Sequence, residues 1–461
     1  MADPLQRRLS LTDAAALVVG CIIGAGIFRL SDSVARQSSS VGLFLAAWVI
    51  GGLLSLCGAL VWAELATRFP RNGGEYVFLS NTFGRSWGFV HGFTRLFVNR
   101  TGTLAILAYV FAEHLARAVG APAGTVRPAA TAAVILLTFL NAAGLRFGKN
   151  IQNIFTALKV AALLGIIAVG ALAGKGATAN FGPLWAPSGN WLSQLGLALI
   201  PVLWTYGGWY EAAYVAGEVK NPERNLPRAI VGGLLATTAL YLAVNLIYVY
   251  YLPLPTLRET DLVAAGAMDR VFPGTGGRLV AAAVMISTFG ALNGYILSGG
   301  RILAAMGEDH SLFRLFGRRH PATDTPILAL GANAALTLVL IWTGTLDSIV
   351  TFTEIVIYLF FAMTGVAALV QRRRHGTPPG VYRVWGFPFT PAVFIALNLA
   401  IVLNGVLEQP REALFGIAIA AVGVPLYWIS WSLDQKKNQP RVAASVVTAS
   451  CRGAESPPRT S

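Results

Sequence analysis

The most constraining feature of this 461-residue sequence is a series of apolar segments, each about 20 residues long, that follow one another along most of the chain. A helix of about 20 apolar residues crosses the hydrocarbon core of a bilayer. Lipid offers no partners to backbone N–H and C=O groups, so such segments must form helices or a closed barrel. Only 12% of the residues are charged, against about 25% in soluble domains. We therefore predict an all-α membrane protein.

About twelve segments meet this length criterion, and we predict one transmembrane helix for each. They form a single predicted transmembrane domain at 12–433, preceded by a short N-terminal segment at 1–11. The tail at 434–461 is rich in Ser, Pro, Lys and Arg and is predicted to be disordered. The predicted helices occupy 12–36, 41–66, 84–112, 127–144, 150–173, 191–216, 229–252, 278–305, 325–343, 346–370, 388–407 and 412–432.

The positions of the basic residues predict the orientation. With the N-terminus in the cytoplasm, the loops on that side hold more than twice as many Lys and Arg residues as the outer loops, in agreement with the positive-inside rule. An even number of helices then leaves both termini cytoplasmic, and we expect a multi-pass protein of the cell inner (plasma) membrane. This topology accounts for the net charge of +14, so nucleic acid is not an expected partner.

Two predicted helices contain residues that disfavour a continuous helix. The first has three glycines within 18–28, and the sixth has Pro201 followed by two adjacent glycines within 200–211. Glycine costs about 1 kcal/mol and proline about 3 kcal/mol in a helix interior. Close helix packing is the alternative explanation, but glycines, proline and polar residues in one short stretch favour a break that lines a cavity.

Interrupted helices at matching places in two halves are typical of transporters. The spacing predicts two five-helix halves in inverted orientation, at 12–173 and 191–370, with two peripheral helices at 388–432. A half-helix that begins near Gly26 offers free N–H groups to a carboxylate. A half-helix that ends near Thr205 offers free C=O groups to an ammonium. An α-amino acid carries both groups, so it is the predicted substrate.

Five motifs resemble one family, in order and over nearly the whole chain. They are GAGIF at 24–28, AELATRFPRNGGEYVFL at 63–79, NAAGLRFGKNIQNIFTALK at 141–159, YGGWYEAAYVAGEVKNPERNLPRAI at 206–230 and STFGALNGYILSGGRILAAMGED at 287–309. The chain is similar to the amino acid–polyamine–organocation superfamily, and within it to the L-type amino acid transporters and their bacterial relatives. The resemblance implies a leucine-transporter-like fold with broken helices 1 and 6.

The resemblance also implies roles for single residues. The substrate carboxylate would bind backbone at 24–26, the ammonium would bind carbonyl groups near Ile22 and at 204–206, and Trp204 would form an aromatic lid. The predicted substrate-binding residues are Ile22, Gly24, Ala25, Gly26, Trp204, Thr205, Tyr206, Gly207 and Asn293. Lys159 lies inside the fifth predicted helix, where a charge is costly; the resemblance implies that its ammonium occupies the sodium site of sodium-coupled relatives. Snorkelling to an interface is the alternative.

Several charged residues have no single interpretation from the sequence. Arg29 could line an outer vestibule or snorkel. Arg95 and Asn99 share a face by i,i+4 spacing and could line a water-filled path or face neighbouring helices. Glu113 is a candidate for proton coupling. Glu211 could meet a cationic substrate or be a packed, hydrogen-bonded carboxylate. Glu64 and Glu75 are expected to anchor an inner gate through ion pairs. Arg100, in the third predicted helix, is also a charged residue whose role the sequence leaves open.

These observations predict a sodium-independent amino acid transporter, working as an exchanger or a proton symporter. The alternative is a membrane nutrient sensor that binds amino acids without moving them. An enzyme is disfavoured, because the sequence contains no HExxH motif and its cysteines, Cys21, Cys57 and Cys451, lack metal-site or disulfide spacing. We expect no cofactor, no metal and no obligatory protein partner besides the amino acid and the lipid bilayer.

Overall fold

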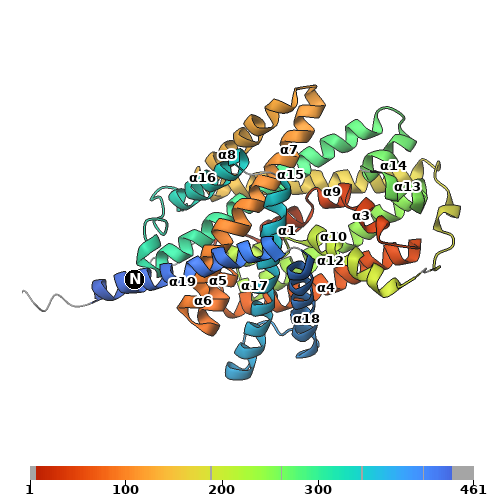
Figure 1. The fold of residues 1–461 in the computed structure, drawn as a ribbon. Coiled ribbons are helices and arrows are strands. Elements are labelled where there is room, and N and C mark those ends of the chain that lie inside the picture. The colour runs from red at the N-terminus through yellow and green to blue at the C-terminus, as the bar shows by residue number, and fades with distance from the viewer. Residues whose placement is uncertain (1–6, 187–188, 261, 344–345, 409, 439–461) are drawn as a thin grey trace, which may run out of the picture.

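The computed structural model describes residues 7–186, 189–260, 262–343, 346–408 and 410–438. Within these ranges the regular structure is helical, apart from an isolated parallel bridge between Leu9 and Val219. Figure 1 shows the helices gathered into one bundle. The chain is therefore an all-helical protein, as the apolar segments predict.

The elements of the first half precede residue 173. They are α1 (Leu11–Ile22), α2 (Gly26–Arg29), α3 (Ser31–Arg36), α4 (Val41–Arg68), α5 (Glu75–Phe83), α6 (Arg85–Thr94), the π-helix η1 (Arg95–Arg100), α7 (Thr101–Val119), the 3₁₀ helix η2 (Ala123–Thr125), α8 (Val126–Ala142) and α9 (Leu145–Leu172).

The remaining elements follow a loop after α9. They are η3 (Thr178–Phe181), α10 (Trp191–Tyr206), α11 (Glu211–Tyr214), η4 (Ala216–Glu218), α12 (Pro222–Tyr251), α13 (Leu254–Glu259), α14 (Val263–Val271), α15 (Gly276–Asp309), η5 (Ser311–Phe313), α16 (Ile327–Thr343), α17 (Leu346–His375), α18 (Phe389–Glu408) and α19 (Pro410–Asn438).

The described part of the chain contains nine helical segments that are long and apolar enough to cross a membrane. Three shorter apolar helices, Trp191–Tyr206, Ile327–Thr343 and Phe389–Asn404, lie at three further predicted spans. The chain is thus a multi-pass membrane protein. The count of twelve spans and the inverted repeat stay predictions.

Both predicted interruptions are present. The helix α1 ends at Ile22 and α2 begins at Gly26, and α10 ends at Tyr206 before α11 begins at Glu211. Gly208, in the second interruption, has a φ of +115°, and a Cβ atom there would lie 2.7 Å from the carbonyl carbon of Cys21. Only glycine permits this backbone conformation together with such a close approach. The two interruptions therefore cross in direct backbone contact.

The helices that surround this crossing come from both halves of the sequence. The helix α1 packs against α12, α9 and α15, and α12 also packs along α4. The helix α7 lies along α15, and α17 along α18. Most buried apolar side chains of these helices form one large core around the interruptions, and two smaller clusters contain residues of α17 and of α15.

Two features differ from the sequence prediction. The third span is not a regular α-helix, because the π-helix η1 separates α6 from α7. In a π-helix the backbone hydrogen bonds join residues five apart, and Arg95, Asn99 and Arg100 are all buried in this segment. The last helix continues to Asn438, which corrects the predicted start of the disordered tail at 434; residues 439–461 lie outside the described residues.

Candidate functional site: a cavity at two interrupted helices

A cavity lies where the two interruptions meet. The first interruption contributes Ile22, Gly24, Ala25 and Gly26, and the second contributes Trp204, Thr205 and Gly207. The other walls come from α4, α7, α15, α17 and α18 and include Ser55, Thr103, Tyr295, Tyr358, Phe361 and Asn398, and Tyr210 of the second interruption also lines the cavity. None of the described lining residues has a charged side chain. The polar groups available to a ligand there are peptide groups, hydroxyls, one amide, the indole N–H groups of Trp204 and Trp209 and the thiol of Cys21.

The peptide groups of the first interruption differ in their availability. The N–H of Gly24 donates to the Ile22 carbonyl at 2.8 Å, so it is already engaged. Gly26 and Ile27 begin α2, and the first N–H groups of a helix have no acceptor within that helix. A Cβ atom on Gly24 would meet nothing within 4 Å, whereas one on Gly26 would lie 2.7 Å from Thr205 Oγ1. Gly24 therefore faces open space, and Gly26 allows α2 to contact α10.

One tyrosine of α12 joins the two interruptions. The hydroxyl of Tyr241 donates to the Ile22 carbonyl at 2.9 Å and also lies 3.4 Å from the Thr205 carbonyl. The Tyr241 side chain is fully buried. Both interrupted backbones are thus attached to a single point on an uninterrupted helix.

Lys159 of α9 lies behind the first interruption. Its Nζ donates to the Gly20 carbonyl at 2.6 Å and to the Ile23 carbonyl at 2.8 Å. Ser287 of α15 donates to the carbonyl oxygens of Ile23 and Gly24, at 2.8 Å and 2.9 Å. Lys159 is fully buried, so its ammonium does not snorkel to an interface. The carbonyl groups freed by the break are therefore held by an ammonium and a hydroxyl.

Two of the predicted substrate-binding residues do not line the cavity. Tyr206 is fully buried, and its hydroxyl donates to the Trp48 carbonyl at 3.1 Å. The Nδ2 of Asn293 donates to Gln152 and to the Gly148 carbonyl, each at 3.1 Å. The Asn293 side chain thus holds α15 against α9, and its contact with a substrate stays a prediction. The other predicted substrate-binding residues lie together around the cavity.

A group of buried charges lies next to the cavity, and we call Glu75, His91, Arg95, Arg100 and Glu211 the central charge cluster. Each of these side chains is at most 3% exposed. Arg100 Nη1 lies 3.0 Å from Glu211 Oε2. Arg95 lies between the two carboxylates, with Nη1 3.9 Å from Glu75 Oε2 and Nη2 3.8 Å from Glu211 Oε1. His91 Nε2 lies 3.8 Å from Glu75 Oε1.

Tyrosines surround the two guanidinium groups of this cluster. The Arg95 guanidinium lies 5.2 Å from the ring centroids of both Tyr210 and Tyr214. The Arg100 guanidinium lies 5.3 Å from the Tyr214 ring and 5.2 Å from the Tyr295 ring. Cation–π contacts of this kind are favourable when the cation is desolvated. Because Tyr210 and Tyr295 also line the cavity, the cluster is separated from it by single aromatic rings.

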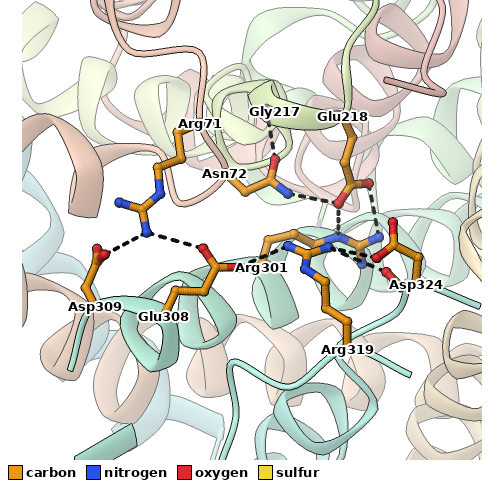
Figure 2. A network of polar contacts seen from close by, with 9 residues as sticks. All are labelled: Arg71, Asn72, Gly217, Glu218, Arg301, Glu308, Asp309, Arg319 and Asp324. Carbon is orange, nitrogen blue, oxygen red and sulfur yellow. Dashed lines mark hydrogen bonds and ion pairs between the residues drawn. The ribbon is translucent and has the colours of Figure 1, made fainter. Parts of the chain in front are cut away.

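A second set of charges joins loops at helix ends, and we call Arg71, Asn72, Glu218, Arg301, Glu308, Asp309, Arg319 and Asp324 the loop network (Figure 2). Glu218 accepts hydrogen bonds from Asn72 Nδ2 at 2.9 Å and from Arg301 Nε at 3.1 Å. Arg71 pairs with Asp309 at 2.8 Å and with Glu308 at 3.3 Å. This network ties the loop after α4 to η4 and to the end of α15.

The segment before α1 also takes part at this end of the bundle. Leu9 N donates to the Glu218 carbonyl, and Lys220 N donates to the Leu9 carbonyl, both at 2.8 Å. Asp13 forms a capping box with Ser10 and an ion pair of 3.0 Å with Lys149 of α9. The segment that precedes α1 is therefore attached to η4 and to the residues that follow it, at the end of the second interrupted helix.

Comparison with known proteins decides the family. Residues 9–428 match the model of the amino acid permease family. This chain belongs to that family. It is 30% identical over 431 residues to the serine/threonine exchanger SteT of Bacillus subtilis (strain 168), covering 92% of this chain and 97% of that protein. It is 31% identical over 434 residues to the b(0,+)-type amino acid transporter 1 of Mus musculus, covering 92% and 88%.

A third relative extends the comparison to another substrate. The chain is 28% identical over 450 residues to the cystine/glutamate transporter of Homo sapiens, covering 96% of this chain and 89% of that protein. The amino acid permeases of the amino acid–polyamine–organocation superfamily are transporters and not enzymes. In general terms, this permease is an amino acid transporter of the membrane.

Sequence reasoning left several residues of the permease without a role. Tyr241 and Ser287 hold carbonyl groups of the first interruption, but a tyrosine in an apolar helix and a serine in a matching motif give no sign of their partners. Of the charges expected in ion pairs, Glu64 pairs with Arg372, with Nε to Oε1 at 3.0 Å. Glu75 instead belongs to the central charge cluster. Arg29 lines a separate hollow with Arg36, His114 and Arg117.

Proposed function

We propose that this permease is a sodium-independent transporter that moves α-amino acids across the cell inner membrane by alternating access, as an exchanger or a proton symporter. It would have twelve transmembrane helices in a five-plus-five inverted repeat with two peripheral helices, and both termini in the cytoplasm. It would act without an obligatory protein partner. Family membership and the cavity between two interrupted helices support this proposal.

The substrate would be held by its zwitterionic head group. The N–H groups at the start of α2 suit a carboxylate, because they lack intrahelical acceptors and lie at the positive end of a helix dipole. The carbonyl groups at the end of α10 suit an ammonium for the opposite reason. Ile22, Gly24, Ala25, Gly26, Thr205 and Gly207 border the space in which both ends would meet. Trp204 would cover the substrate as a lid.

The observation that carries sodium independence is the position of Lys159. Its ammonium lies 2.6 Å and 2.8 Å from two carbonyl oxygens that the helix break leaves free. A bound sodium ion would need such oxygen ligands. Because the Lys159 ammonium already donates hydrogen bonds to both carbonyl oxygens, these oxygens need no sodium ion as a partner.

A counterflow assay in proteoliposomes tests this function. Vesicles preloaded with a mixture of unlabelled amino acids should accumulate labelled amino acid equally well in sodium and in potassium buffers. Lys159→Ala should lose most of this uptake, because two carbonyl groups lose their cation. A strict requirement for sodium in the unaltered protein would contradict the proposal. Saturable binding without counterflow would favour a sensor instead.

The mode of coupling is read from the same vesicles. An exchanger accumulates label only when the vesicles are preloaded, whereas a proton symporter also responds to an imposed pH gradient in empty vesicles. Accumulation in empty vesicles without any gradient would contradict both modes.

A further inference from the structure

The wall of the cavity combines an uncharged surface with a buried ion pair directly behind it. We propose that the cavity selects amino acids with uncharged side chains, and that the Arg100–Glu211 pair behind Tyr210 and Tyr295 sets this selectivity. The inference rests on the proposed function, since it names the class of amino acid that the same cavity takes.

The first step is the chemistry of the lining. The described lining consists of peptide groups, of aliphatic, aromatic, hydroxylic and amide side chains, and of the Cys21 thiol. The peptide groups at the interruptions can compensate the carboxylate and ammonium of the substrate backbone. Nothing in the described lining compensates a further charge, and burying an ionised side chain without a partner is strongly unfavourable. An uncharged side chain has no such cost.

The second step is the place of the ion pair. Glu211 directly follows Tyr210, and Arg100 precedes Thr103 by one helical turn; Tyr210 and Thr103 both line the cavity. The Arg100 guanidinium lies 5.2 Å from the ring of Tyr295, another lining residue. Both charges are therefore one side chain behind the wall. At 3.0 Å from each other, they cancel as seen from the cavity.

The third step is that the protein does not use all the hydrogen-bonding capacity of this pair. Arg100 Nε and Nη2 and Glu211 Oε1 are buried without a hydrogen-bond partner within the described structure. Low dielectric surroundings strengthen the field of an uncompensated charge. Arg95 and Glu75 remain nearby and balance each other, so removing Arg100 or Glu211 would leave the central charge cluster with one unit of net charge that attracts an opposite charge across the wall. The Arg100–Glu211 pair does not touch the substrate; it acts on the substrate's side chain through the lining residues Tyr210 and Tyr295.

Substrates matched in shape test the selectivity. In counterflow, the unaltered protein should prefer glutamine over glutamate and norleucine over lysine by at least about tenfold each, as expected where a site cannot satisfy a buried charge. Equal uptake within either pair would overturn the proposal. Absence of counterflow for all four amino acids would overturn the proposed function itself, so the two failures are distinguishable.

Two single variants and their combination test the ion pair. Glu211→Gln should shift the glutamate-to-glutamine ratio upward by about tenfold, and Arg100→Gln should shift the lysine-to-norleucine ratio upward by a similar factor. The double variant should return both ratios toward those of the unaltered protein, because no net charge remains behind the wall. A purely structural role would lower the uptake of all four substrates together and leave both ratios unchanged, which would overturn the assignment.

Controls separate selectivity from folding. Glu218→Gln removes a carboxylate that also pairs with a buried arginine, but Glu218 does not line the cavity; both ratios should stay as they are, whatever the rate. Each variant is checked by gel filtration in detergent. If the Gln variants do not fold, Arg100→Lys keeps the positive charge and should keep both ratios, and the ratios of the unaltered protein alone still decide the charge class.

Discussion

The central charge cluster and the loop network contain the same kinds of groups but differ in surroundings. In the loop network, Glu218 accepts from Asn72 and Arg301 at 2.9 Å and 3.1 Å, and the outer pairs of Arg71 are about one third exposed, with side chains at 38%, 35% and 28%. In the central cluster all side chains are buried. There Arg95 stays 3.8–3.9 Å from both carboxylates, which is too far for a hydrogen bond.

This difference indicates which ion pairs can break when the protein changes conformation. Partly exposed ion pairs are weak because water replaces their partners at little cost. Buried charges that lose a partner have no such replacement. The partly exposed pairs of Arg71 can therefore break and re-form during a transport cycle, whereas the central charge cluster and the buried Glu218–Arg301 pair keep their charge balance. Buried ionisable groups at membrane depth are retained for function.

The largest effect is expected from Arg95→Leu in the central cluster. Arg95 lies between two buried carboxylates, and its loss would leave both with less compensation. Breaking a buried ion pair costs about 3–5 kcal/mol. We expect a large fall in the apparent melting temperature of the detergent-solubilised protein, measured by thermal unfolding. A melting temperature close to that of the unaltered protein would show that the cluster is not held by its charges.

An intermediate effect is expected from Glu218→Gln in the loop network. The variant keeps an acceptor for Asn72 but leaves the guanidinium of Arg301, which is 3% exposed, without its counter-charge. Hydrogen bonds to charged groups contribute about 1.5–3 kcal/mol. The expected melting shift is smaller than that of Arg95→Leu under the same conditions, and a larger shift would reverse the ranking of the two networks.

The smallest effect is expected from Arg71→Ala at the edge of the loop network. Exposed ion pairs contribute about 0–1 kcal/mol and are screened by salt. The melting temperatures of this variant and of the unaltered protein should converge at high ionic strength. The difference for Arg95→Leu should persist there, because salt does not screen fully buried charges. A salt-sensitive Arg95→Leu difference would break the comparison.

The sequence alone predicts the parts of this site that depend on local backbone chemistry. The glycines at 24, 26, 207 and 208 and the proline at 201 identify both interruptions, because each residue type disfavours a helix by itself. Lys159 stands out for the same local reason, a charge inside an apolar segment. These predictions need no knowledge of which helices are neighbours.

The remaining features depend on contacts between distant segments. Glu75 and Tyr214 are 139 residues apart in the sequence and hydrogen-bonded in the structure. Asn293 has the polarity expected of a substrate contact, yet it faces α9 because α15 packs there. The π-helix η1 changes the spacing of the backbone hydrogen bonds within the third span from four to five residues. Composition and periodicity carry no signal for these arrangements.

The shared hydrogen-bonding position of Tyr241 has a mechanical consequence. Its hydroxyl touches the carbonyl groups of Ile22 and Thr205 together, so α12 is pinned to both discontinuous segments at the depth where each one bends. A rocking motion that preserves these contacts would move α12 and the two interrupted segments together. Because Ile22 and Thr205 both line the cavity, a movement of α12 would change the shape of the cavity at both interruptions at once.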